Sequence, residues 1–170
     1  MAAGDHRKKN MLIIFSIGIV LLIAAIILIY LFIFARANGQ LPSVTVKIGS
    51  ATFQTEIADT MATQARGLSY RTSLGADDAM LFVFASATVQ NFWMKDMNFP
   101  LDMIWIGDGK VNGFAENAAP QPGVPLWSLT IYSSPGGTDK VLEVNAGIVA
   151  KYRIKVGDPV TIIGGKYANN

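Results

Sequence analysis

Residues 11–34 form an uninterrupted apolar run without a charged side chain. As an α-helix with a rise of about 1.5 Å per residue, this run would be roughly 36 Å long, which is enough to cross a hydrocarbon core of about 30 Å with some tilt. Three basic residues, 7–9, precede the run, whereas only Arg36 follows it closely. By the positive-inside rule, the sequence predicts a single-pass anchor in the cell membrane, with a cytoplasmic tail (1–10) and an extracytoplasmic C-terminal domain.

A cleaved signal peptide is the alternative to an anchor. The tripeptide Ala35-Arg36-Ala37 resembles a small-x-small cleavage site. However, the apolar run is much longer than the roughly 7–15 residues of a signal-peptide core. The length of the run therefore favours an uncleaved membrane helix.

The charge of the chain resides in its N-terminal tail. The chain has 14 Lys and Arg residues and 12 Asp and Glu residues; three and one of these lie in the tail, which leaves eleven of each after residue 34. Without a basic excess, a nucleic-acid partner is not expected. The roughly 130 residues that remain are enough for one domain with its own core.

Two missing residue types limit the chemistry of this domain. The chain has no cysteine, and its only histidine is His6 in the tail. The domain therefore lacks disulfides, a Ser-His-Asp or Cys-His triad, and a His/Cys zinc site. Any metal would need oxygen ligands, and acid–base catalysis would depend on Asp, Glu, Lys or Tyr. Nothing in the sequence indicates a cofactor.

After a linker (35–43), the first half of the domain shows strand periodicity. Apolar residues alternate with polar ones in 44–48 and 53–57, on either side of the turn Gly49-Ser50, which predicts a β-hairpin. A short helix is expected from Met61 to Arg66, followed by a buried strand over residues 80–84. The small residues that follow predict a loop over 85–90.

The second half adds further short strands. Gly107-Asp108-Gly109 is typical of a hairpin turn, and the three prolines of residues 118–127 indicate a loop outside the sheet. The pattern also predicts strands at 101–106, 110–117, 129–132, 141–144 and 160–163, a glycine-rich loop at 133–139 and a helix through 148–152 capped by Asn145. These elements predict a mainly β domain over 44–163, an antiparallel sandwich or barrel with two short helices and a tail (164–170).

Six short motifs occur in order along the domain. They are Arg66-Gly67-Leu68, Met80-Leu81-Phe82-Val83-Phe84, Phe92-Trp93-Met94-Lys95, Pro100-Leu101-Asp102, Leu142-Glu143 and Gly157-Asp158. With them, the chain resembles the uncharacterised prokaryotic family called domain of unknown function 192. The resemblance implies a small β-rich domain that is often exported or membrane-anchored, and it implies no established reaction. Asp96-Met97 stands where the family commonly has Asn-Thr or Asn-Met, which adds a charge beside Lys95.

The segment 91–102 concentrates the candidate site residues. Trp93 is either a core residue or a stacking platform for a sugar ring. In an extended segment, Phe92 and Met94 point away from Trp93, so one face of the segment is core and the other is free to line a groove. Trp127, at the end of the proline-rich loop, is the better candidate for an exposed ring.

Four charged residues complete the candidate set. Lys95 and Asp96 are either solvated charges or polar contacts of a groove. Asp102 and Glu143 each lie within an apolar strand, where a carboxylate needs partners such as Lys95 or backbone N–H groups. The two carboxylates form either a catalytic pair or a structural network.

Three functions are compatible with these residues. The first is a membrane-anchored binding module for a saccharide or envelope polymer, with Trp93, Lys95, Asp96, Asp102, Trp127 and Glu143 as candidate ligand contacts. The second is a glycoside hydrolase or lyase that uses Asp102 and Glu143, whose carboxyl separation would decide the mechanism. The third is a protein-interaction domain of the cell envelope, which an exposed apolar patch would favour.

Overall fold

The computed structural model describes residues 15–31 and 41–169, and the chain divides into the units Met1–Gln40 and Leu41–Asn170. In the first unit, residues 15–31 form an α-helix. Among the described residues, no helix combines the length and the apolar character that crossing a membrane requires. The tail 1–10, both ends of the expected membrane helix and residues 35–40 of the linker lie outside the described part. The membrane anchor therefore stays a prediction.

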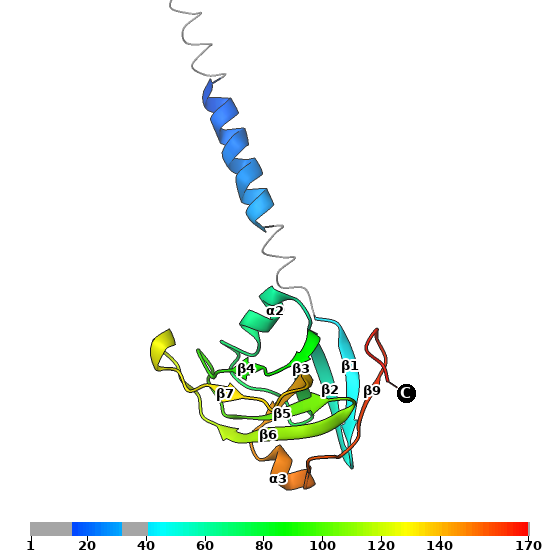
Figure 1. The fold of residues 1–170 in the computed structure, drawn as a ribbon. Helices are drawn as coiled ribbons and strands as arrows, with labels where there is room; N and C mark the ends of the chain where they lie inside the picture. The colour runs from blue at the N-terminus through cyan, green and yellow to red at the C-terminus, as the bar shows by residue number, and fades with distance from the viewer. Residues whose placement is uncertain (1–14, 32–40, 170) are drawn as a thin grey trace, which may run out of the picture. The chain divides into compact units, whose positions relative to one another are not determined.

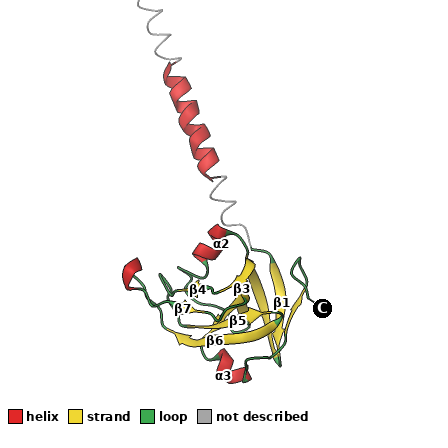
Figure 2. Cartoon of the chain, in the orientation of Figure 1, coloured by secondary structure: helices red, strands yellow, loops and turns green. Residues whose placement is uncertain are grey.

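The second unit is built on a curled sheet of seven strands in the order β6-β5-β8-β3-β2-β1-β9 (Figures 1 and 2). The strands are β1 (Ser43–Ile48), β2 (Ala51–Ala58), β3 (Asp78–Thr88), β5 (Leu101–Gly107), β6 (Lys110–Ala118), β8 (Thr138–Asn145) and β9 (Val160–Ile163). The two ends of the sheet meet beside β6, where Val111 N–H donates to the Asp158 carbonyl at 2.9 Å and Gly157 N–H to the Val111 carbonyl at 2.8 Å. The sheet therefore curls into a half-barrel. This confirms the expected mainly β class of the domain.

One strand pair departs from the expected antiparallel arrangement. β2 and β3 run parallel, from the pair Gln54–Asp78 to the pair Ala58–Phe82. Parallel neighbours need a long crossover, because the chain has to return to the starting end of the sheet. Residues 59–77 supply this crossover and contain the helix α2 (Met61–Arg66). A fully antiparallel sheet was therefore the wrong expectation at this position.

Apolar side chains pack on both faces of the sheet. The first core includes Val46, Phe53, Leu81, Ile104, Leu142, Val144 and Ile162, together with Ile148 and Val149 of the helix α3 (Ile148–Tyr152). The second core includes Leu68, Met80, Phe82, Phe92, Met97, Met103 and Trp105. It also receives the small sheet of β4 (Asn91–Phe92) and β7 (Tyr132–Ser133). The central strands are thus buried on both sides, unlike the half-buried hairpin β1–β2.

Several local predictions are confirmed. The hairpin β1–β2 has the expected alternation, and α2 spans Met61–Arg66, where Thr60 and Thr63 form a capping box. Gly67 ends α2 at φ 48°, a backbone conformation that favours glycine. Asp108 and Gly109 both have positive φ, as a two-residue type I′ hairpin turn requires.

Three local predictions are wrong. β3 continues to Thr88 across residues expected to form a loop, because an irregular register after Val83 lets the exposed small residues stay extended. β7 covers Tyr132–Ser133, so only Tyr132 of the expected strand 129–132 lies in a strand, and Ser133 was expected in a loop. Gly147, at φ 85°, precedes α3 in place of Asn145, whose side-chain amide donates to the Gly75 carbonyl at 2.8 Å.

Asp102 is a structural residue of this fold. Its side chain is fully buried, with Oδ1 accepting from Asn117 N–H at 2.8 Å and Oδ2 from Val149 N–H at 2.9 Å. These bonds satisfy both carboxylate oxygens and join β5 to the end of β6 and to the first turn of α3. Of the two alternatives for Asp102, the structure therefore favours the structural network.

Replacing Asp102 by Ala should destabilise the domain by about 2–5 kcal/mol, because the buried Val149 N–H and the partly buried Asn117 N–H both lose their acceptor. Urea denaturation followed by circular dichroism measures this change. The matched control is Asp77→Ala, which removes an exposed carboxylate and should change stability by no more than about 0.5 kcal/mol. Equal midpoints for the two variants would contradict the structural role of Asp102.

Candidate functional site

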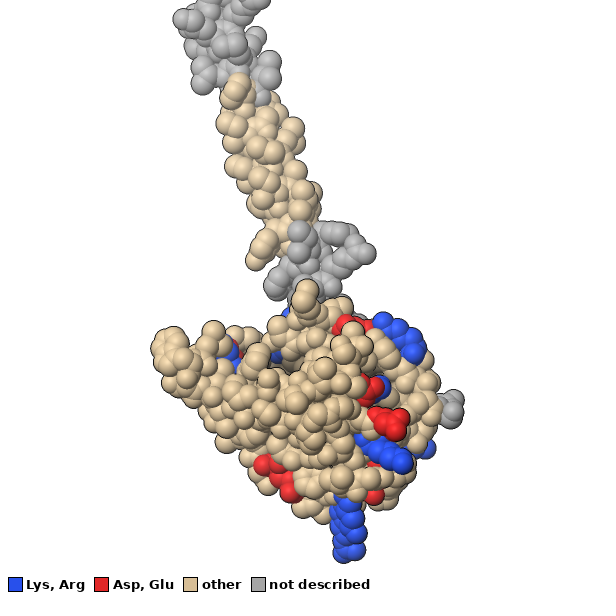
Figure 3. All heavy atoms as spheres, in the orientation of Figure 1, with Lys and Arg blue, Asp and Glu red and all other residues tan. Residues whose placement is uncertain are grey.

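A pocket of about 280 Å³ lies between α2 and the second-core face of the sheet. Its walls are Met61 and residues 64–69, Phe82 and Phe84 of β3, Asn91 and Phe92 of β4, Trp93, Met97, and Glu143 of β8. In the space-filling view, a hollow is visible below α2, surrounded mostly by uncharged atoms with a few Lys or Arg atoms at its rim (Figure 3). The pocket is therefore mainly apolar and opens to solvent.

Glu143 is the buried carboxyl of this pocket. It lies opposite Met80 of β3 and Met103 of β5, so its side chain shares the second-core face with these residues. The residue is 5% exposed, and within the described part of the chain its carboxyl has no hydrogen bond or ion pair. Burial in these apolar surroundings raises the pKa of Glu143 from 4.5 to about 8. At neutral pH the Glu143 carboxyl is therefore mostly protonated.

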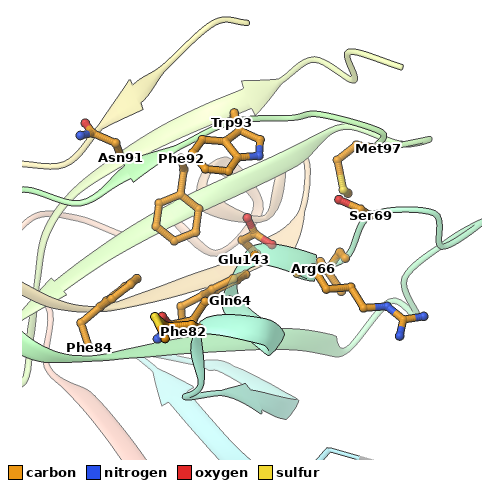
Figure 4. Close-up of a pocket in the computed structure, with 14 residues that line it drawn as sticks. Gln64, Arg66, Ser69, Phe82, Phe84, Asn91, Phe92, Trp93, Met97 and Glu143 are labelled. Atoms are coloured by element: carbon orange, nitrogen blue, oxygen red, sulfur yellow. The ribbon is translucent and has the colours of Figure 1, made fainter. Parts of the chain in front are cut away.

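Aromatic rings line the same pocket as the Glu143 carboxyl. The Phe92 ring packs edge-on against Phe82, with ring centroids 4.9 Å apart, and against Phe84 at 6.2 Å. Trp93 is 44% exposed, whereas its neighbours Phe92 and Met94 are buried, as the extended segment predicted. Figure 4 shows the Glu143 carboxyl directed toward the rings of Phe92 and Trp93. Trp93 is thus a pocket residue that is partly exposed to solvent.

The segment that carries Trp93 is held by the turn after α2. Ser69 Oγ donates to the Lys95 carbonyl at 3.0 Å, and Tyr70 N–H donates to the Asp96 carbonyl at 2.9 Å. Tyr70 and Asp96 both adopt positive φ, 65° and 55°, which is uncommon for residues other than glycine. Two strained turns therefore meet beside the pocket and fix the course of residues 93–97.

Lys95 and Asp96 pair with each other. Lys95 Nζ forms an ion pair with Asp96 Oδ2, to which Tyr70 Oη also donates at 2.7 Å. The Lys95 ammonium and then the Tyr70 hydroxyl hold the pKa of Asp96 below its usual range. Because Lys95 already has a partner, it is not a partner of Glu143.

The structure separates the other two candidate residues from the pocket. Asp102 lies opposite Val144 in the β5–β8 pair, so its side chain projects from the opposite face of the sheet to that of Glu143. The two carboxylates do not form a pair, and the catalytic arrangement considered from the sequence is absent. Trp127 lies in the 3-10 helix η1 (Leu126–Ser128), is 88% exposed as expected, and does not line the pocket.

Several pocket residues were not identified from the sequence, namely Gln64, Arg66, Ser69, Phe82, Phe84 and Met97. Alternate residues of the predicted strand 80–84 share one face, so the sequence indicates that Phe82 and Phe84 lie on the same side of the sheet. Assigning them to the pocket also requires the pairing of Met80 with Glu143, which no local pattern indicates. Gln64 positions α2, since its Nε2 donates to the Val83 carbonyl at 2.7 Å.

The pocket is suited to binding rather than to acid–base catalysis by two groups. Among its lining residues, Glu143 and Arg66 are the titratable ones, and the Arg66 guanidinium points away from the carboxyl (Figure 4). No group of three His, Cys, Asp or Glu residues suitable for a metal ion occurs within the described ranges. A lone carboxyl donates a hydrogen bond when protonated and attracts a cation when ionised.

The stability of the domain should fall as pH rises from about 4.5 to about 8. In this range folded Glu143 keeps a proton that the unfolded chain has released, so unfolding free energy decreases by up to about 1.4 kcal/mol per pH unit. Glu143→Gln should remove this slope and be the more stable protein at pH 8. Urea denaturation at pH 5, 6, 7 and 8 tests this prediction. Parallel pH profiles for the two proteins would refute it.

Comparison with known proteins identifies the family and two related crystal structures. The family DUF192, described as "Uncharacterized ACR", matches residues 44–162. A protein of unknown function from Novosphingobium aromaticivorans is 37% identical, with a TM-score of 0.64 over 71% of this chain and 85% of its own. A Sinorhizobium meliloti protein, described as a "putative transcription regulator", is 29% identical, with a TM-score of 0.65 over 72% of this chain and 95% of its own. None of the curated proteins matches the chain significantly. The chain belongs to the DUF192 family, which confirms the resemblance seen in its motifs.

Proposed function

We propose that this protein is a membrane-anchored, extracytoplasmic binding module that holds one saccharide unit of a cell-envelope polymer in the Glu143 pocket. The observation that carries this proposal is the pocket itself, which has a buried carboxyl without a partner and an exposed tryptophan ring. Buried polar groups are normally satisfied, so an unsatisfied one that faces an open pocket is readily explained by a ligand.

The size and lining of the pocket support a small cyclic ligand. Its volume of about 280 Å³ is slightly below the range of about 300–1,000 Å³ that is common for small-molecule sites, which leaves room for one ring. Trp93 offers an apolar ring surface on which the C–H face of a sugar can pack. Asn91, Ser69 and Glu143 add polar groups for hydroxyl contacts.

The sequence supports the proposed anchor and orientation. The apolar run 11–34 is long enough to span a membrane, and the basic residues before it favour a cytoplasmic N-terminus. The domain after it has balanced charge and no cysteine or histidine. A tethered module of this kind would place its pocket in the envelope.

An envelope protein-interaction domain is the second candidate function. Leu126 and Trp127 are 67% and 88% exposed in η1, which protrudes from the domain and is drawn in yellow in Figure 1. Aromatic residues are enriched at protein interfaces, so this exposed pair supports a contact with another protein. A hydrolase has no comparable support, because Glu143 lacks a second carboxylate in the pocket.

Saccharide binding should depend on Trp93 and not on Trp127. Trp93→Ala removes the ring surface at the pocket, so affinity for a bound envelope saccharide should fall about 10-fold or more. Trp127→Ala is the matched control and should bind as the unchanged protein does. Isothermal titration with cell-wall fragments measures both. If both variants bind equally well, Trp93 is not part of a sugar site.

The full chain should sediment with membranes and resist extraction by alkaline carbonate. Replacing Ile23 by Arg adds about 2.5–3.5 kcal/mol to the cost of helix insertion and should release part of the protein. A protease added outside intact cells should reach the C-terminal domain. A mature band that lacks the first 37 residues would show that the segment is a cleaved signal peptide.

A further inference from the structure

We infer that the pocket selects ligands that carry a protonated amino group, and that Glu143 is the counter-ion of this group. The inference rests on the proposed function and narrows it, because it names an amino sugar with a free ammonium group as the saccharide class. The shared chemistry is an alkylammonium ion, which an amino sugar or the headgroup of an aminophospholipid can supply.

The two buried carboxyls differ in their hydrogen-bond partners. Asp102 and Glu143 are the buried carboxyl residues within the described ranges. Asp102 has a backbone N–H group on each oxygen, at 2.8 and 2.9 Å, whereas Glu143 has no hydrogen-bond or ionic partner and faces the pocket. The fold therefore satisfies one carboxyl by itself and leaves the other for a ligand.

Aromatic side chains form part of the pocket wall. The rings of Phe92 and Trp93 line the pocket together with Glu143, and Phe82 packs against Phe92 (Figure 4). The faces of aromatic rings attract cations, most strongly where water is excluded. A carboxyl next to aromatic rings stabilises an ammonium group by two independent attractions. A neutral sugar oxygen would gain only a hydrogen bond there.

Among the residues that the structure describes, no cation pairs with Glu143. Arg66, the other charged residue of the pocket lining, directs its guanidinium away from the carboxyl. Lys95 beside the pocket is paired with Asp96. Glu56 lies in the same row of the sheet, on β2, and is neutralised by Arg71 through two bonds of 2.7 Å. The charge of a bound ammonium group would therefore be balanced by Glu143.

The residues that face Glu143 on the two neighbouring strands have no titratable side chain, so Glu143 is the group that gains or loses a proton there. Met80 of β3 and Met103 of β5 face it across the sheet, and the nearby Asp102 projects from the other face. Because burial raises the pKa of Glu143 to about 8, an ammonium ligand has to displace a proton at neutral pH. Its affinity should therefore rise nearly tenfold from pH 6 to pH 7. A neutral ligand that accepts the carboxyl proton should bind equally at both values.

The test uses the full chain in phosphatidylglycerol nanodiscs and phosphate buffer, so that neither lipid nor buffer supplies an amine. The probes are glucosamine, N-acetylglucosamine and ethanolamine, measured by isothermal titration at pH 6 and pH 7. Glucosamine and N-acetylglucosamine share the sugar ring and differ in charge. Glu143→Gln removes the counter-ion, and Glu116→Gln, at an exposed position on β6, is the control.

The expected result is that glucosamine binds about 10- to 100-fold more tightly than N-acetylglucosamine at pH 7. Its affinity rises with pH, and this preference is lost in Glu143→Gln and retained in Glu116→Gln. If ethanolamine binds as tightly as glucosamine, the ammonium inference holds and the saccharide proposal fails. If N-acetylglucosamine binds as tightly as glucosamine, saccharide binding holds and the ammonium inference is overturned. If no probe binds to the folded protein, both are overturned.

Discussion

The register of β8 is the constraint on which both the core and the pocket depend. This strand lies between β3 and β5, and its side chains alternate between the two cores. Leu142 and Val144 enter the first core, while Glu143 enters the second. Because side chains alternate with a period of two, a slip by one residue would bury the carboxyl in the first core. Asp102, through its bond to Val149 just after β8, helps to hold this register.

The two buried carboxyls show how environment separates the roles of similar residues. Asp102 accepts backbone N–H groups at the start of α3 and at the end of β6, so it completes the fold. Glu143 faces Met80 and Met103 on the neighbouring strands, shares its pocket with aromatic side chains, and has no hydrogen-bond or ionic partner within the described structure. Burial therefore acts on Glu143 without compensation. The first carboxyl connects elements of the fold, and the second gives the pocket its chemistry.

Local structure was predictable where a local pattern determines it. The alternation in 44–57, the turn at Asp108-Gly109 and the helix ended by Gly67 all follow from residue types within a few positions. The parallel pair β2–β3 was not predictable, because strand direction depends on where the crossover places the next strand. The pocket was only partly predictable for the same reason. Trp93 and Glu143 were both candidates, but their proximity results from pairings over long separations in sequence.

An unpaired carboxyl in β8 is costly for a domain of this size. A raised pKa of about 8 means that folding at neutral pH retains a proton that the unfolded chain would release, at a cost of about 3 kcal/mol. Total stabilities are commonly only about 5–15 kcal/mol, so this is a large fraction. An apolar residue at this position would continue the second core without that cost. A carboxyl that weakens the sheet and faces an open pocket therefore supports the proposed binding role rather than a role in folding.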